Sequence, residues 1–279
     1  MKIKLLLAIT FLLNSFLMAE CQRCIVIYGD TRTDNEAHKK VVEGIMKIEP
    51  KIVFHNGDMV ADSSDLSQWK NFEEVVSTLM AKAEFFPVIG NHELKGIDNY
   101  FSFFKLTPGK RWYSLDREGI HFIVLDSFSP YNKNSPQYIW LENDLKSNRN
   151  SPIIVITHVP FYSSGLHAKD CIPQRKELEP LLVKYEVKAV FSGHDHFYER
   201  SYHSKIYYIV SGGGGAPLYK KEKESINPYS QFHLIDYHFI TISLLDGKIL
   251  VEAMTPDLKV FDSFTIPIEK KSNKKIKTN

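Results

Sequence analysis

Short apolar runs alternate with amphipathic stretches along most of the chain. The runs have the length and the β-branched content of buried strands, and they lie at residues 24–28, 52–54, 85–89, 120–125, 153–156, 188–191 and 206–210. Stretches with the apolar spacing of an amphipathic helix separate many of them, at residues 35–48, 66–82, 136–146 and 174–185. This alternation of strands and helices predicts an α/β fold.

A different pattern occupies the end of the chain. Polar and apolar positions alternate over residues 237–244 and 248–254, and Asp246-Gly247 joins the two segments, which predicts a β-hairpin. No internal repeat and no linker divides the chain. Its 279 residues, of which 43% are hydrophobic, therefore predict one large domain over residues 20–268.

The first nineteen residues have the composition of a secretory signal peptide. Lys2 and Lys4 precede an apolar run at residues 5–18, and Ala19 provides a small residue for cleavage. The run is shorter than the roughly 20 residues that a membrane-spanning helix needs, so an uncleaved anchor is the weaker alternative. We expect an exported, periplasmic or secreted protein with no transmembrane segment in the mature chain.

Three cysteines follow the expected cleavage point. Cys21 leaves lipoprotein anchoring open, although Glu20 before it is a poor fit for lipidation. Cys21, Cys24 and Cys171 are too few for a four-cysteine zinc site. A disulfide is the favoured interpretation, and its pairing stays open.

Charge is nearly balanced, with 35 basic and 33 acidic residues and a net charge of +2. Residues 269–279 contribute five lysines against one glutamate and predict a basic, disordered tail. Nothing in the rest of the chain predicts a nucleic-acid partner.

Polar side chains follow five of the predicted strands at the point where each strand ends. In the last of these segments, Gly193-His194-Asp195-His196, two imidazoles flank one residue. Residues i and i+2 of an extended or looped segment can turn toward one point, and neutral imidazole is a common metal ligand. Open α/β sheets bind ligands at the carboxyl ends of their strands. The six candidate ligands are Asp30, Asp58, Asn91, His158, His194 and His196.

Each candidate taken alone has a structural explanation. Asp30 and Asp58 follow glycines and could form turns, Asn91 could cap a helix, and His158 could be a hydrogen-bonded loop histidine. Six such residues on five strand ends are better explained by two divalent ions. Ions about 3.5–4 Å apart need one bridging carboxylate and neutral donors that keep them Lewis-acidic. Asp58 is the candidate bridge.

The order of these motifs resembles that of the calcineurin-like metallophosphoesterases. The motifs are Gly-Asp, Gly-Asp, Gly-Asn-His-Glu, a single histidine and Gly-His-x-His, and they cover nearly all of residues 25–215. Gly193-His194-x-His196-x-Tyr198-Glu199-Arg200 and His158-x-Pro160-x-Tyr162 resemble the purple acid phosphatase branch most closely. The resemblance implies a four-layer α/β/β/α sandwich of two mixed sheets flanked by helices.

The resemblance also implies roles for the candidates. The implied ligands are Asp30, Asp58 and His196 for metal 1, and Asp58, Asn91, His158 and His194 for metal 2. The implied ions are two divalent or trivalent ions of Fe, Zn or Mn. Asn91, His92 and His167 would face a small-molecule phosphoester substrate, with His92 and His167 in catalytic roles. His167 could instead be an ordinary loop histidine.

The chain departs from the family pattern at two positions near metal 1. The histidine of an Asp-x-His motif is Arg32 here, and the tyrosine three residues after the bridging aspartate is Ala61. Metal 1 therefore lacks one protein ligand, and the colour of an iron–tyrosinate should be absent. Arg32 could bind the substrate phosphate through its fixed charge, or it could pair with Asp34 at the surface.

Together these residues predict an exported dinuclear-metal phosphoesterase, a phosphomonoesterase of the acid phosphatase type. Metal ions lower the pKa of bound water toward roughly 7, so the predicted step is attack by metal-bound hydroxide. His92, with help from His167, would donate a proton to the leaving group. One alternative is a phosphodiesterase acting on nucleotide or lipid substrates. Another is a metal-binding, catalytically weak envelope protein.

Overall fold

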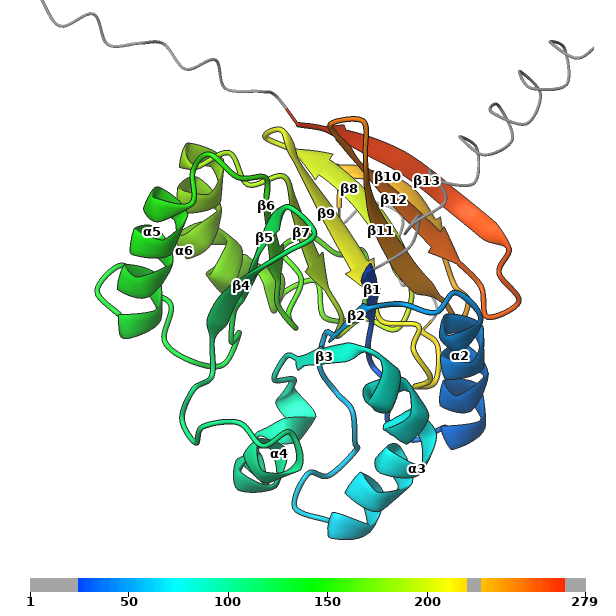
Figure 1. Ribbon diagram of the computed structural model, residues 1–279. Helices are drawn as coiled ribbons and strands as arrows, with labels where there is room; N and C mark the ends of the chain where they lie inside the picture. Colours follow the sequence, from blue (N-terminus) through cyan, green and yellow to red (C-terminus); the bar gives the residue numbers. More distant parts are fainter. Residues whose placement is uncertain (1–24, 220–226, 269–279) are drawn as a thin grey trace, which may run out of the picture.

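Two mixed β-sheets form the centre of the protein in the computed structural model, which describes residues 25–219 and 227–268 (Figure 1). The first sheet has six strands in the order β13-β12-β11-β1-β2-β3. They are β1 (Ile25–Tyr28), β2 (Ile52–His55), β3 (Glu84–Pro87), β11 (Phe239–Leu245), β12 (Lys248–Met254) and β13 (Val260–Pro267). Because β1, β2 and β3 pair in parallel, the loops that follow them leave from the same edge.

The second sheet has seven strands in the order β10-β8-β9-β7-β6-β5-β4. They are β4 (Tyr113–Arg117), β5 (Ile120–Val124), β6 (Ile153–Ile156), β7 (Ala189–Ser192), β8 (Tyr198–His203), β9 (Ile206–Ser211) and β10 (Ser230–Leu234). Here β5, β6, β7 and β9 are parallel to their neighbours, so the loops after β6 and β7 also share an edge.

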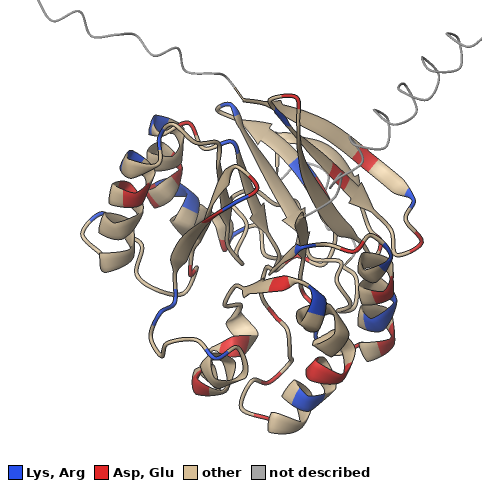
Figure 2. Cartoon of the chain, in the orientation of Figure 1, with Lys and Arg blue, Asp and Glu red and all other residues tan. Residues whose placement is uncertain are grey.

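Helices cover the outer face of each sheet. α2 (Asn35–Lys47) and α3 (Leu66–Lys82) lie on one side of the molecule, and α5 (Pro136–Ser147) and α6 (Cys171–Lys184) lie on the other (Figure 1). A 3-10 turn, η1 (Asn91–Glu93), and the short α4 (Ile97–Phe103) follow β3. The four longer helices carry both basic and acidic side chains (Figure 2), as helices with one face in water do.

Three hydrophobic cores separate the layers. Alternate residues of β1 enter different cores: Ile25 and Ile27 join the core between the two sheets, whereas Val26 and Tyr28 join the core with α2 and α3. The third core packs α5 and α6 against the second sheet. Because neighbouring strand residues point to opposite faces, buried runs on both sheets give four layers. The predicted α/β/β/α sandwich is confirmed.

Most predicted elements are present, some with shifted ends. The helix at 66–82 and the strands at 153–156 and 248–254 have the predicted bounds, whereas the helix predicted from residue 174 begins at Cys171. The sequence analysis missed α4 and the strands β4, β8, β10 and β13. The aromatic residues around α4 pack in the core with α2 and α3, as expected for wall or core residues.

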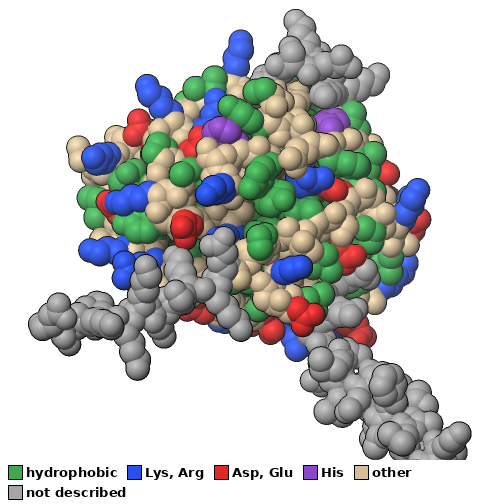
Figure 3. Space-filling view, turned by 90° about the horizontal axis from the view of Figure 1, so that it is seen from above, with side chains coloured by type: hydrophobic (Ala, Val, Ile, Leu, Met, Phe, Trp, Pro, Cys, Tyr) green, Lys and Arg blue, Asp and Glu red, His purple; other side chains and the backbone are tan. Residues whose placement is uncertain are grey.

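Several predictions concern the ends of the chain. The signal peptide, Cys21, Cys24 and the basic tail lie outside the described residues. Cys171 is a buried free thiol. Among the helices of residues 25–219 and 227–268, none is long and apolar enough to cross a membrane. On the face seen in Figure 3, basic, acidic and apolar side chains are interspersed.

Candidate metal centre

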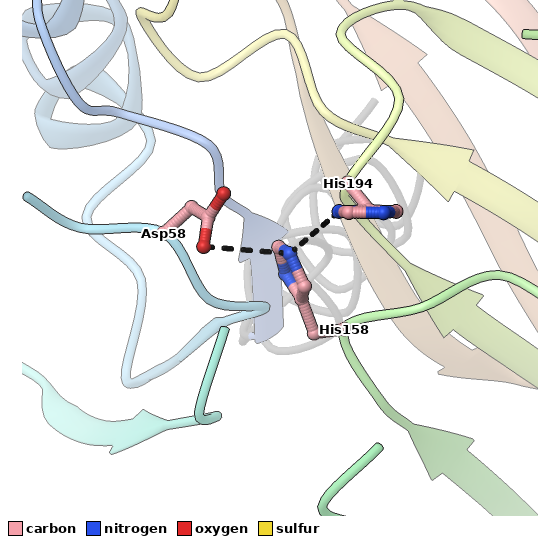
Figure 4. Close-up of side chains that lie close together, drawn as sticks. All are labelled: Asp58, His158 and His194. Carbon is pink, nitrogen blue, oxygen red and sulfur yellow. Dashed lines mark hydrogen bonds and ion pairs between the residues drawn. The ribbon is translucent and has the colours of Figure 1, made fainter. Parts of the chain in front are cut away.

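The loops that follow β2, β3, β6 and β7 bring four predicted ligands to one point. The Nε2 atom of His158 lies 3.1 Å from Asn91 Oδ1, 3.2 Å from His194 Nδ1 and 3.4 Å from Asp58 Oδ1. Figure 4 shows Asp58, His158 and His194 converging from separate loops. These four residues are the set predicted for metal 2.

The protonation of His158 makes this cluster suitable for a cation. Its Nδ1 lies 2.9 Å from the backbone oxygen of Asn56. A carbonyl oxygen only accepts hydrogen bonds, so Nδ1 carries the proton and Nε2 presents a lone pair. Asn91 Oδ1 and Asp58 Oδ1 also present lone pairs, and no proton lies between these atoms and Nε2. The lone pairs of these atoms therefore repel one another, and a cation bound between them would be coordinated by them.

A second group contains the two remaining predicted ligands. His196 Nδ1 donates a hydrogen bond to the backbone oxygen of Pro217 at 2.7 Å, which leaves Nε2 facing Asp30 Oδ1 at 3.6 Å. His196 Nε2 is buried and has no hydrogen-bond partner. Buried polar atoms nearly always have partners, so an unpartnered ring nitrogen beside a buried carboxylate fits a metal site.

Asp58 contacts the first group and acts electrostatically on the second, since its charge raises the pKa of Asp30 and opposes the lowering of the pKa of His196. Its Oδ1 faces His158, whereas its Oδ2 faces Arg32 Nε at 3.6 Å and His92 Nε2 at 3.8 Å. The backbone N–H of His92 also donates to Oδ1, at 3.1 Å. Two oxygens of one carboxylate therefore point to different sides, which is the arrangement required of a bridging ligand.

Backbone conformation aims these side chains. Asp30, Asp58 and His194 have φ values of 56°, 57° and 71°, in the left-handed region that non-glycine residues rarely adopt. Such residues cluster at functional sites, where the surrounding structure holds them. Gly193 lies so close to Asp30 that a Cβ there would overlap Asp30 Oδ2.

Burial sets the charge of the site. It lowers the pKa of His194 to about 3, helped by His158 and His167, and it lowers the pKa of His196 to about 4. Burial and the neighbouring Asp58 raise the pKa of Asp30 well above its usual range. The imidazoles are therefore neutral, as metal ligands must be, and the nearby carboxylates gain stability from a cation.

Two residues without predicted roles position the ligands. Glu93, fully buried, accepts hydrogen bonds from the backbone N–H groups of Asp58, Met59 and Gly90 at 2.9, 2.9 and 2.7 Å. Asn56 donates to the backbone oxygens of Ser192 and Ser211, at 2.8 and 3.0 Å, and so ties the loop after β2 to the second sheet. Glu93 was visible in the Gly-Asn-His-Glu motif, but the role of Asn56 had no signal.

The predicted substrate-facing histidines lie at the edge of the cluster. The side chain of His92 is 26% exposed, and its Nδ1 lies 2.6 Å from the backbone oxygen of Ala61. The ring of His167 lies 4.0 Å from the ring of His194. Asp170, which sequence reasoning missed, reaches both: its Oδ2 lies 3.2 Å from His167 Nδ1 and 3.3 Å from His194 Nε2.

Arg32 lies in the centre and is not paired with Asp34. Asp34 instead caps α2 by accepting a hydrogen bond from the N–H of Ala37. The Arg32 guanidinium contacts Asp58, as described above, and its Nη2 donates to the hydroxyl of Tyr219 at 3.4 Å. Of the two alternatives, the structure therefore favours a role in the site.

Comparison with known proteins places this site in a family. A family model described as "Calcineurin-like phosphoesterase" matches residues 25–198. Purple acid phosphatase 21 of Arabidopsis thaliana is 28% identical over 75% of this chain and 54% of its own length. The chain spans about half the length of the curated relatives it matches first.

Solved structures share the fold. The purple acid phosphatase PPD1 from yellow lupin (Lupinus luteus) seeds superimposes with a TM-score of 0.79 at 24% identity, over 88% of this chain and 53% of that one. The GAP50 anchor of the inner membrane complex of Plasmodium gives 0.75 at 22% identity, over 89% of both chains. Because the family model covers well over half of the chain, including all six predicted ligands, this protein belongs to the calcineurin-like phosphoesterase family.

Proposed function

We propose that the protein is a metal-dependent phosphoesterase that hydrolyses small phosphate esters, as a phosphomonoesterase of the acid phosphatase type. One observation carries the proposal: oxygen lone pairs of Asp58 and Asn91, and the Nδ1 atom of His194, whose Nε2 faces the Asp170 carboxylate as a donor, converge on the unprotonated nitrogen of His158. Membership of the phosphoesterase family and the purple acid phosphatases among its relatives support it.

The proposed ligands are those of the sequence analysis: Asp30, Asp58 and His196 for metal 1, and Asp58, Asn91, His158 and His194 for metal 2. Ions of Fe, Zn or Mn bound there would act as Lewis acids toward phosphoryl oxygens and would lower the pKa of bound water. Neutral imidazoles and a two-sided Asp58 carboxylate support this assignment.

His92 is the proposed proton donor to the leaving group. The bond from its Nδ1 to the backbone oxygen of Ala61 fixes the ring, so Nε2 faces the site. In the imidazolium form, a ring held in this way can give up its Nε2 proton without turning, and it then stays neutral with its remaining proton on Nδ1. His167, held by Asp170, is the proposed second substrate contact.

We also propose export through residues 1–19 and a catalytic domain over residues 20–268. Export agrees with a lysine-flanked apolar run of signal-peptide length. The alternative to a free exported protein is one anchored by lipid attachment at Cys21.

A second candidate function is metal binding with little catalysis. Arg32 and Ala61 replace ligands of the family pattern at metal 1, which favours this reading. The fold is also shared with GAP50, which is described as an anchor. Retention of His92 beside Asp58 argues for the enzyme.

Asp58→Asn tests the proposal. We expect the purified wild type to retain metal and to hydrolyse p-nitrophenyl phosphate, and the variant to lose at least about 100-fold in kcat/KM, the loss typical of removing one transition-state stabiliser. Asp257→Asn, at an exposed carboxylate far along the chain in the β12–β13 turn, is the matched control and should keep full activity.

The outcomes separate the candidates. Hydrolysis of bis-p-nitrophenyl phosphate in preference to the monoester would indicate a phosphodiesterase. Metal uptake without hydrolysis of either ester would indicate the binding protein, and unchanged activity in Asp58→Asn would refute the proposed centre.

A further inference from the structure

Tyr219 covers the metal 1 side of the centre. Its ring stacks on the ring of His196, with centroids 4.0 Å apart and planes 18° apart. Its backbone N–H donates to the backbone oxygen of His196 at 3.1 Å. These two contacts with His196 fix the Tyr219 ring, and they place its hydroxyl beside Arg32.

Arg32 presents the edge of its guanidinium that can bind two oxygens. Nη2 donates to the Tyr219 hydroxyl at 3.4 Å, whereas Nε is buried, has no hydrogen-bond partner and lies 3.6 Å from Asp58 Oδ2. These two nitrogens form one side of the planar fork that binds carboxylates and phosphates. In the described part of the chain, Arg32 makes no hydrogen bond to a carboxylate, so a donor is left for a ligand.

The Tyr219 hydroxyl has a free proton as well. An oxygen that accepts a hydrogen bond from Arg32 can still donate its own proton elsewhere. Tyr219 and Arg32 therefore combine two unused donors and one fixed positive charge beside the proposed bridge. An anionic oxygen is the ligand that satisfies all three.

We propose that Arg32 and Tyr219 together bind a non-bridging phosphoryl oxygen of the substrate on the metal 1 side. The inference rests on the proposed function, and it adds Tyr219 as the partner of Arg32, which the sequence already suggested as a phosphate contact. Arg32 places a positive charge at the position where the family pattern has a metal-binding histidine. A group with two negative charges gains more from this charge than a group with one, so the pair should act more strongly on monoesters than on diesters.

Phosphate binding measured by calorimetry tests the pair independently of turnover. With metal-loaded protein and inorganic phosphate as the probe, we expect Tyr219→Phe to weaken binding about ten-fold, the value of one hydrogen bond to a charged group. Arg32→Gln should weaken it by about ten- to a hundred-fold, and Arg32→Lys should restore part of the loss because it keeps the charge.

Matched controls remove similar groups elsewhere. Tyr202→Phe alters an exposed tyrosine on β8, and Arg117→Gln removes an arginine that pairs with Glu84 at the surface. Both should leave phosphate affinity unchanged. The double variant Arg32→Gln/Tyr219→Phe should lose less than the sum of the single losses, because the two side chains contact each other.

Three results would overturn the inference. The first is unchanged phosphate affinity in Tyr219→Phe with metal content equal to the wild type. The second is a visible iron–phenolate absorption band in the Fe-loaded protein that Tyr219→Phe abolishes, which would make Tyr219 a metal ligand. The third is a wild type that takes up no metal and hydrolyses no ester, and this result alone refutes the proposed function too. Should Arg32→Gln fail to fold, Tyr219→Phe still decides.

Discussion

Backbone carbonyl oxygens determine which ring nitrogen of His158, His92 and His196 faces the proposed metal centre. Asn56, Ala61 and Pro217 supply the oxygens that hold Nδ1 of His158, His92 and His196. A carbonyl oxygen cannot donate, so each of these rings is fixed as a donor at Nδ1 and turns Nε2 inward. His194 is reversed: its Nδ1 faces His158 and its Nε2 faces Asp170. Because His158 presents Nε2 and His194 presents Nδ1, the two imidazoles can face one point from neighbouring loops.

His121 provides a pH-dependent test away from the centre. Its Nε2 lies 2.7 Å from Asp144 Oδ2 and its Nδ1 lies 2.8 Å from Asp116 Oδ1. Burial alone would lower the pKa of His121, but the hydrogen bonds to Asp144 and Asp116 outweigh burial and raise it. A group whose pKa is raised on folding stabilises the protein below its unfolded pKa, about 6.5, and loses that contribution as pH rises through the folded pKa.

The test compares His121→Gln with the wild type by urea denaturation. We expect the variant to lose about 1–2 kcal/mol in free energy of unfolding at pH 5, where the imidazolium bonds two carboxylates, and less at pH 8. Asp144→Asn should show the same pH trend, because it removes the other member of the pair. A loss of free energy of unfolding that was larger at pH 8 than at pH 5 would contradict the raised pKa of His121.

Sequence reasoning found the candidate ligands because metal chemistry permits few residue types and parallel strands end at one edge. The loops after β2, β3, β6 and β7 bring Asp58, Asn91, His158 and His194 together as expected. Tyr219 and Asp170 could not be found in this way. Each reaches the centre through the path of a loop, which depends on contacts far apart in sequence.

At the scale of elements, residues 193–200, which carry His194 and His196, also hold a neighbouring loop through two carboxylates. Asp195, between the two histidines, accepts hydrogen bonds from Ser163 Oγ and from the N–H of His167. Glu199, at the start of β8, accepts from Ser164 N and Oγ at 2.7 and 2.6 Å. Both carboxylates are buried, so they hold the loop that carries His167 against the metal centre.

Gly165 shows how closely this loop is packed. A Cβ at residue 165 would overlap the Asp195 carboxylate, which is buried and cannot withdraw easily. We expect Gly165→Ala to lower stability by about 1–3 kcal/mol, the cost of overpacking. Displacement of His167 should also lower kcat/KM for p-nitrophenyl phosphate by about ten-fold, within the range of one positioned acid–base group or less.

Gly109→Ala is the matched control. A Cβ at residue 109 meets nothing within 4 Å, although its φ of 81° disfavours alanine. It should therefore cost about 1 kcal/mol of stability and leave kcat/KM unchanged. Equal activity in Gly165→Ala and the wild type would show that the loop position does not matter for hydrolysis.

The missed strands share a physical cause. β4, β10 and β13 lie at sheet edges, where one side has no strand neighbour and exposure weakens the apolar pattern. β8 is interior, but it begins with Tyr198-Glu199-Arg200, whose polar groups have partners that only the folded chain supplies. Buried parallel strands such as β6 need no such partners, and the sequence predicted β6 to the residue.

At the scale of the whole molecule, polar contacts join the two sheets. Tyr198 and Arg200 of β8 both bond Asp262 of β13: the tyrosine hydroxyl and Arg200 Nε each lie 2.7 Å from Asp262 Oδ2, and Arg200 Nη2 lies 3.1 Å from Oδ1. The single stretch 193–200 thus supplies two proposed ligands, two carboxylates that hold a loop and a link between sheets.

The proposed ligands join the sheets as well. Asp30, Asp58 and Asn91 follow strands of the first sheet, whereas His158, His194 and His196 follow strands of the second. Bound ions would therefore tie the two sheets and would bind the folded state alone, since the unfolded chain does not bring these loops together.

Removal of metal by a chelator should accordingly lower the thermal midpoint. With free metal at 100 times its Kd, binding adds about 2.7 kcal/mol to the free energy of unfolding, so the Tm should rise on addition of Zn²⁺, Mn²⁺ or Fe²⁺ and fall with chelation. His158→Ala, which removes the nitrogen at the centre of the metal 2 group, should abolish most of this shift. His203→Ala, a histidine at the end of β8 that bonds Glu179, is the control and should keep it. An equal shift in both variants would place the stabilising ion somewhere other than between the sheets.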